Sequence, residues 1–432
     1  MTTTQSRHSA YRRQRPAWAP GWPIYLMLYG YPLWWALGID VFLWLGLTLP
    51  IVAWLWGRRN VLMPPGAGWW TLFVGWVVLS GSQLAGVDDF PSFVFRLSIY
   101  IAAGIWFVYA ANLSAEGNAN RIARAFLWFF AFLVFAGLFA LLTPVTDFVT
   151  PFERVLPRSI SSIPFVNQMI HGHVSQVHDF IGFAVARPAA PFAFTNEWGS
   201  AVGLLAPVAV FAVTRLPAGP KRVAGYALLV LALFPAIYSL NRGLWLSIAF
   251  ALGYVALRAL LRGRPRPFMN LVGIALVVAA LFVLTPLGDL ASSRLETGHS
   301  DARRTSLVEQ SLDGIAEAPI VGHGGPRVNP EEPDRAPIGT HGQIWLLGYS
   351  HGIPAVVLFL LTMVAILMGT WRANEDELGF WVNAVVFVAI VQMFFYSLIP
   401  VQLQFIMILS GISLAQAREK AEPLPRWDQS RD

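Results

Sequence analysis

The side chains best suited to chemistry lie in a polar stretch that interrupts an otherwise apolar chain. The stretch runs from Gly288 to His341, where apolar sequence resumes. It carries several arginines, namely Arg294, Arg303, Arg304, Arg327 and Arg335. Guanidinium groups match phosphate oxygens with paired hydrogen bonds. Because the stretch borders hydrophobic sequence, it predicts a site for a phosphate-bearing lipid.

Two further arginines stand beside apolar segments. Arg242 lies in the short segment 239–243 between two apolar runs, and Arg187 lies shortly before another run. A guanidinium stays charged and is costly in lipid, so we expect each one in a wet or anion-containing pocket. The alternatives are a snorkelling side chain for Arg242 and a solvated loop position for Arg187.

An amphipathic helix is expected inside the polar stretch, from Ser306 to about Glu317. Ser306 and Glu309 fit a capping box. One face carries the apolar side chains Leu307, Val308, Leu312 and Ile315. Arg303 and Arg304 then lie at the start of the helix, where free backbone amides also favour anions. This arrangement suits a diphosphate, and pairing of the two arginines with nearby carboxylates is the alternative.

Histidines are the candidates for proton transfer. His341 lies at the junction of loop and membrane, where a neutral imidazole accepts a proton near neutral pH; an ordinary interfacial histidine is the alternative. The spacing of His171, His173 and His178 is compatible with a metal, but no patterned carboxylate stands nearby, so we expect an ordinary loop. The chain has no cysteine, which excludes disulfides and cysteine nucleophiles.

The composition indicates a membrane protein. The 432 residues are 56% hydrophobic and 12% charged, with a mean hydropathy of +0.56. These values predict an all-α, polytopic bundle of transmembrane helices. The net charge of +6 does not indicate a nucleic-acid partner, because the basic residues are dispersed over short loops.

Twelve apolar segments approach the length of a membrane span. They cover residues 23–38, 41–56, 68–84, 93–111, 122–142, 198–213, 223–240, 243–260, 268–287, 344–367, 380–398 and 401–415. The expected organisation is a tail of residues 1–22 without a signal-peptide cleavage site, a transmembrane domain of residues 23–416, and a tail of residues 417–432. Two large loops, of residues 143–197 and 288–340, fall inside the domain.

The distribution of charge predicts the orientation of the chain. About two thirds of the 30 basic residues fall in the tails and in alternate short loops, whereas most acidic residues fall on the other side. Cytoplasmic loops are enriched in lysine and arginine. Both termini are therefore expected in the cytoplasm, and both large loops outside.

Several segments resemble the O-antigen ligase and polymerase family of polytopic glycosyltransferases. The first is Ser239-Leu240-Asn241-Arg242-Gly243. The second is Arg304 with its helix ending in Ala318-Pro319-Ile320-Val321-Gly322-His323-Gly324, and the third is Gly339-Thr340-His341 running on to Gly352-Ile353. Arg187 to Asn196 also looks like a family motif that precedes a span. The resemblance covers about residues 187–370, in the family's order.

The resemblance implies transfer of a glycan from an undecaprenyl-diphosphate carrier to an acceptor sugar, on the outer face of the cytoplasmic membrane. It implies neither a metal nor a nucleotide cofactor. The donor diphosphate would be held by Arg187, Arg242, Arg294 and Arg304, and His341 would activate the acceptor hydroxyl. Fixed arginines would also stabilise the charge that grows on the leaving group. Gly342 and His351 depart from the family pattern, on the acceptor side.

A multi-span transporter or a lipid-linked glycan flippase is the competing interpretation, because it shares the number of spans. Ion-coupled transporters usually bury a carboxylate within the bundle. No predicted span has a clear aspartate or glutamate near its middle, which favours the transferase. Ligase and polymerase differ in their acceptor, so the sequence leaves both open.

Overall fold

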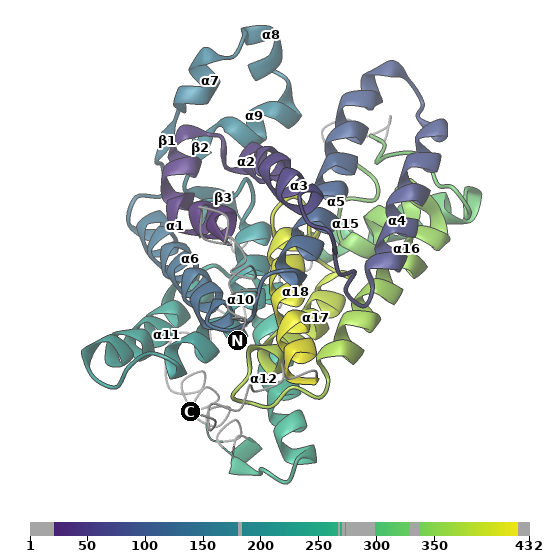
Figure 1. Cartoon of the computed structure of the whole chain (residues 1–432). Coiled ribbons are helices and arrows are strands. Elements are labelled where there is room, and N and C mark those ends of the chain that lie inside the picture. Colours follow the sequence, from purple (N-terminus) through teal and green to yellow (C-terminus); the bar gives the residue numbers. More distant parts are fainter. Residues whose placement is uncertain are drawn as a thin grey trace, which may run out of the picture.

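Helices dominate the computed structural model, which describes residues 21–179, 184–266, 268, 269, 273, 299–328 and 337–421 (Figure 1). The first six helices are α1 (Trp22–Leu37), α2 (Asp40–Gly46), α3 (Thr48–Trp56), α4 (Ala67–Ser80), α5 (Phe90–Ala111) and α6 (Asn118–Leu142). Short 3₁₀ turns occupy Gly81–Gln83 and Val87–Asp89. The later long helices are α10 (Thr195–Thr214), α11 (Pro220–Tyr238), α12 (Arg242–Leu261), α15 (His299–Glu317), α16 (Gln343–Thr370), α17 (Leu378–Gln392) and α18 (Gln402–Ala421).

Helix ends coincide with residues that suit them. Proline stands in the first turn of α1, α5 and α11, where its missing N–H costs no helical hydrogen bond. Gly38 ends α1 with a left-handed φ of 79°. A Cβ at Gly38 would lie 2.4 Å from Thr150 Oγ1, so only glycine lets the loop after α6 approach this turn.

The centre of the bundle is α18, which packs against α5 and α17 (Figure 1). Its residues from Gln402 to Ala415 are all buried, as expected for a helix enclosed by other helices. Two of its buried side chains donate to neighbouring backbone: Gln404 Nε2 donates to Ile99 O at 3.2 Å, and Gln402 Nε2 donates to Glu197 O at 2.9 Å. These bonds satisfy the two amide nitrogens, whereas the Oε1 atoms of both glutamines are buried without a partner among the described residues.

Six described helices are long and apolar enough to cross a membrane, which makes the chain an all-α membrane protein. They are Val87–Ala111, Asn118–Leu142, Thr195–Thr214, Pro220–Tyr238, Arg242–Leu261 and Gln343–Thr370. Of the twelve expected spans, residues 268–287 lie almost wholly outside the described residues, and each of the others coincides with one helix or two consecutive helices. However, α1 has 16 residues and α17 has 15, below the about 20 that a span needs. The count of twelve is therefore not supported.

The loop expected over residues 143–197 is largely structured. It contains β1 (Asp147–Phe148), α7 (Pro151–Val155), α8 (Arg158–Ser161), α9 (Pro164–Ile170), β2 (Gly172–His173), β3 (Ser175–Asp179) and β4 (Ala184–Pro188). Two antiparallel pairs form, β1 with β2 and β3 with β4. In Figure 1, α7, α8 and α9 project at the top of the bundle.

The helix in the second large loop begins earlier than expected. It was expected to start at a Ser306 cap, but α15 begins at His299, so Ser306 lies inside the helix and the capping box is wrong. Arg303 and Arg304 therefore occupy the second turn, where backbone amides bond within the helix rather than to an anion. Leu307 is buried as expected, whereas Leu312 is exposed.

Contacts between loops give the bundle two distinct ends. At the basic end, which comprises loops 57–66, 112–117, 215–219, 262–266 and 371–377, Arg58 Nη1 donates to Asn112 O at 2.9 Å and Arg262 Nη2 donates to Trp371 O at 2.8 Å. The opposite end, here the loop end, holds β1–β4, the starts of α10, α12 and α16, and the turn between α17 and α18.

Candidate active site

Arg187 is held at the loop end beneath the start of α12. It lies in β4 opposite Gln176 of β3, and only 7% of its surface is exposed. Its Nε donates to Ser239 O at 2.7 Å. Ser239 caps the C-terminus of α11. The strand pair therefore attaches Arg187 to the segment that carries Arg242.

Arg242 is the first residue of α12, and the tight turn before it is well determined. Leu240 adopts a left-handed φ of 49°, which is strained for a leucine. Asn241 caps the helix, because its Oδ1 accepts from Leu244 N at 3.3 Å. Its Nδ2 donates to Thr195 O at 3.2 Å, at the start of α10. An anion beside Arg242 would therefore be attracted both by the guanidinium and by the N-terminus of α12.

A turn between α17 and α18 joins the start of α12 to the start of α16. Tyr396 of this turn donates its hydroxyl proton to Asn241 Oδ1, and its carbonyl oxygen accepts from Gln343 N at 2.8 Å. In the same turn, Met393 O accepts from Ile344 N at 3.0 Å. The first amides of α16 are therefore satisfied by the turn that also contacts the cap of α12.

His341 lies two residues before α16, and it is half-buried. Its Nδ1 is 3.4 Å from Thr340 Oγ1, and that hydroxyl donates to Pro337 O at 2.7 Å. The same segment is tied to α15, because Gly339 N donates to Ser311 Oγ at 3.2 Å. Loop residues thus hold His341 between α15 and the 393–396 turn.

The expected site residues are brought together in part. Arg187, Arg242 and His341 all lie at the loop end, linked through Ser239, Asn241 and Tyr396 by the contacts above. Arg294 lies outside the described residues. Arg304 lies in α15, a helix that packs on α16, and its side chain is outside the described part of the structure.

Two positions at the loop end were not expected from the sequence. Tyr396 had no motif that distinguished it from other interfacial tyrosines. Arg96 lies within the spanning segment Val87–Ala111, and its Nη1 would be 3.2 Å from a Cβ at Gly325, in the loop after α15. Among the described residues, Arg96 makes no hydrogen bond or ion pair. A charge inside an apolar span was the available signal for it.

His351, which departs from the family pattern, is a packing residue in the structure. It is 1% exposed, and its Nδ1 lies 2.7 Å from Ser80 Oγ of α4. The next residue, Gly352, breaks α16 with a φ of 79°. The break leaves the amide of Ile353 without a helical partner, and Ile353 N donates instead to Pro319 O at 2.8 Å. This position therefore joins α4, α16 and the loop after α15.

His171 has the carboxylate partners that the sequence did not reveal. Its Nδ1 lies 2.8 Å from Glu153 Oε2, and its Nε2 lies 2.6 Å from Asp147 Oδ1. Burial acts to lower its pKa, but the hydrogen bonds to Asp147 and Glu153 outweigh burial, so the pKa of His171 is raised. Within the described residues, no three metal-binding side chains form a group.

The sequence model of the O-antigen ligase family matches residues 227–360. The matched region runs from α11 into α16, and it includes Arg242, Arg304 and His341, whereas Arg187 precedes it. No curated protein matches the chain. Over residues 227–360, this membrane protein is therefore similar to the O-antigen ligase family.

Proposed function

We propose that the protein transfers a glycan from a polyprenyl-diphosphate carrier to an acceptor sugar during surface polysaccharide assembly. One observation carries the proposal: Arg187, Arg242 and His341, which are far apart in sequence, lie at one end of a membrane bundle around the 393–396 turn. The family match over residues 227–360 supports the same chemistry. Undecaprenyl diphosphate is the carrier proposed.

The donor side of the site is cationic. Arg187 and Arg242 would hold the diphosphate, with Arg294 and Arg304 as further ligands from the polar stretch. As the bond between the anomeric carbon and the diphosphate oxygen breaks, negative charge grows on that oxygen. Fixed guanidinium groups and the amides at the start of α12 stabilise this charge without reorganising.

The acceptor side requires a base. The acceptor hydroxyl oxygen forms the new bond to the anomeric carbon, and its proton passes to His341. The undecaprenyl diphosphate departs with the bonding electron pair, so atoms and charges balance without a metal or nucleotide. His341 is suited to this step because a neutral imidazole accepts a proton near neutral pH.

The membrane placement follows from charge. We propose that the loop end lies outside the cytoplasmic membrane, because about two thirds of the 30 lysines and arginines fall in the tails and in the loops and helix ends of the basic end. Both chain termini would then be cytoplasmic. Ion-coupled transport has less support: Asp40 and Glu197 lie in the first turns of α2 and α10, so no described spanning helix carries a carboxylate at its middle.

The decisive experiment is transfer from a purified undecaprenyl-diphosphate-linked glycan by the full chain in detergent or liposomes. General-base assistance is worth about 10²- to 10⁴-fold in rate, so His341→Ala should lose activity by that factor while it still binds donor. His173→Ala is the matched control, since His173 bonds only to Ala193 O among the described contacts. Normal turnover by His341→Ala, or loss of wild-type activity on adding a chelator, would contradict the mechanism.

A further inference from the structure

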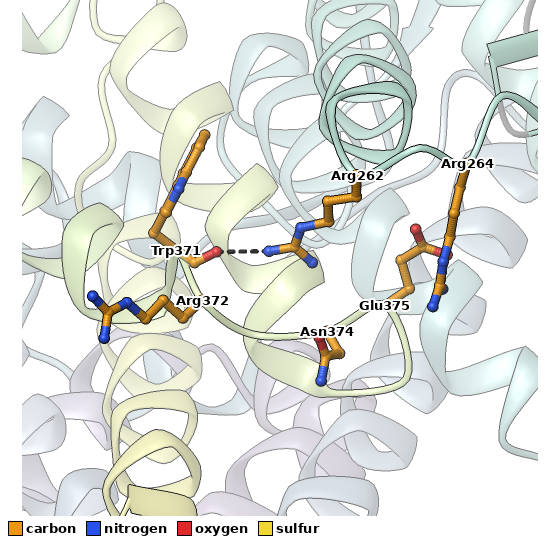
Figure 2. Close-up of a pocket in the computed structure, with 6 residues that line it drawn as sticks. All are labelled: Arg262, Arg264, Trp371, Arg372, Asn374 and Glu375. Atoms are coloured by element: carbon orange, nitrogen blue, oxygen red, sulfur yellow. Dashed lines mark hydrogen bonds and ion pairs between the residues drawn. The ribbon is translucent and has the colours of Figure 1, made fainter.

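A second cationic site lies at the basic end, away from the proposed active site. A cavity of about 420 Å³ is lined by Arg262, Arg264, Trp371, Arg372, Asn374 and Glu375. It lies where the C-terminal ends of α12 and α16 meet (Figure 2). Three guanidinium groups and one carboxylate give the lining an excess of positive charge.

The three arginines of this cavity differ in their hydrogen bonds and ion pairs. Arg262 holds the two helix ends together, because its Nη2 donates to Trp371 O at 2.8 Å and its Nη1 donates to Ala373 O at 2.7 Å. Arg264 Nη1 lies 3.0 Å from Glu375 Oε2 (Figure 2). Arg372 makes no hydrogen bond or ion pair with the described residues. The only lining carboxylate is thus already paired, and donors of Arg262 and Arg372 are available to an anion.

The surroundings of the cavity indicate a lipid rather than a soluble anion. Trp371 is 49% exposed, and tryptophan at a helix end is typical of the headgroup level of a membrane. Leu261, next to Arg262, is exposed, as is Met368, about one helical turn before Trp371. Exposed apolar side chains within one helical turn of the cationic lining offer a surface for an acyl chain close to a site for its phosphate.

We propose that this cavity binds the phosphate headgroup of an anionic phospholipid in the leaflet at the basic end. Basic pockets between membrane helices bind such headgroups through charge and hydrogen bonds. Arg264 and Arg372 supply charge to the phosphate, and Arg262 both holds the ends of α12 and α16 together and offers its remaining donors. The proposal does not depend on glycan transfer.

Native mass spectrometry of the detergent-purified full chain tests this site. The probe is phosphatidylglycerol, compared with phosphatidylcholine of the same acyl chains. Wild type should bind phosphatidylglycerol preferentially, and Arg264→Gln/Arg372→Gln should weaken that binding about tenfold or more, since each basic residue contributes substantially near a membrane surface. Arg59→Gln is the matched control, because Arg59 is an exposed arginine of the same end outside the cavity.

Three outcomes would overturn the proposal. Equal phosphatidylglycerol binding by wild type and the double variant removes the cavity as the site. Displacement of the lipid by glycerol 3-phosphate at equal concentration assigns the site to soluble phosphate esters instead. If the double variant does not purify as a single species, the single variants Arg372→Gln and Arg372→Lys replace it. Arg372→Lys should retain phosphatidylglycerol binding, and Arg372→Gln should weaken it. Equal phosphatidylglycerol binding by these two variants is the third contradicting outcome.

Discussion

At the scale of single residues, the proposed chemistry depends on the shape of charged groups as well as on their charge. Arg187 illustrates this, because its Nε donates to Ser239 O at 2.7 Å, and the planar guanidinium carries its donors in a fixed geometry. An ammonium group is a point charge without that fixed geometry. Residue-scale predictions therefore compare substitutions that preserve charge with ones that remove it.

Arg242→Lys should retain fold and abundance yet lose most transfer activity. The change keeps the charge at the first position of α12 but removes the paired hydrogen bonds to a diphosphate, worth about 1.5–3 kcal/mol, or about 10- to 100-fold in rate. The measurement is transfer from the purified lipid-linked donor, with Arg59→Lys as the control at an exposed site. Wild-type rates in Arg242→Lys would remove this residue from the donor site.

The contacts of His171 should make the stability of the loop of residues 143–197 depend on pH. Because the pKa of His171 is raised, its stabilising contribution is complete below the unfolded value of about 6.5 and is lost as the pH rises through the folded value. Hydrogen exchange of residues 147–173 should therefore accelerate as the pH rises through that window, after correction for intrinsic exchange rates. His171→Gln should abolish this dependence, and an unchanged pH profile in that variant would contradict the assignment.

At the scale of elements, the site depends on the contact between the start of α12 and the 393–396 turn. Gly243 is essential to this contact, because a Cβ there would lie 2.5 Å from Tyr396 Oη and 3.0 Å from Phe395 Cδ2. The same helix contains Gly253, where a Cβ would meet no atom within 4 Å. This pair of glycines separates an effect on the contact from an effect on helix propensity.

Gly243→Ala should reduce transfer about 10²-fold, because a displacement of about 1 Å between reacting groups costs that much. Gly253→Ala in α12 should be neutral or slightly stabilising, by about 0.5–1 kcal/mol, since alanine favours a helix. Transfer rates and thermal unfolding of both variants provide the test. Equal rates in the two variants would show that the contact between α12 and the turn does not position the site.

At the scale of the whole molecule, the two ends of the bundle should face opposite sides of the membrane. The chain has no cysteine, so single cysteines report topology directly. Glu309→Cys in α15 should react with an impermeant reagent while the cytoplasmic membrane is intact, and Arg59→Cys should react only after permeabilisation. Both positions are exposed, so the reverse pattern would invert the proposed orientation.

The sequence by itself determined the class of protein, the positions of most helices, and Arg187, Arg242 and His341 as residues of interest. It could do so because hydropathy, charge and short motifs are local properties. Only the tertiary structure decided that Tyr396 joins α12 to α16, that His351 packs on Ser80, and that Arg262 meets Trp371. These contacts join residues about 50 to 270 positions apart, which no local pattern encodes. The start of α15 was missed for a related reason, because a good capping box at Ser306 competed with an equally favourable helical segment before it.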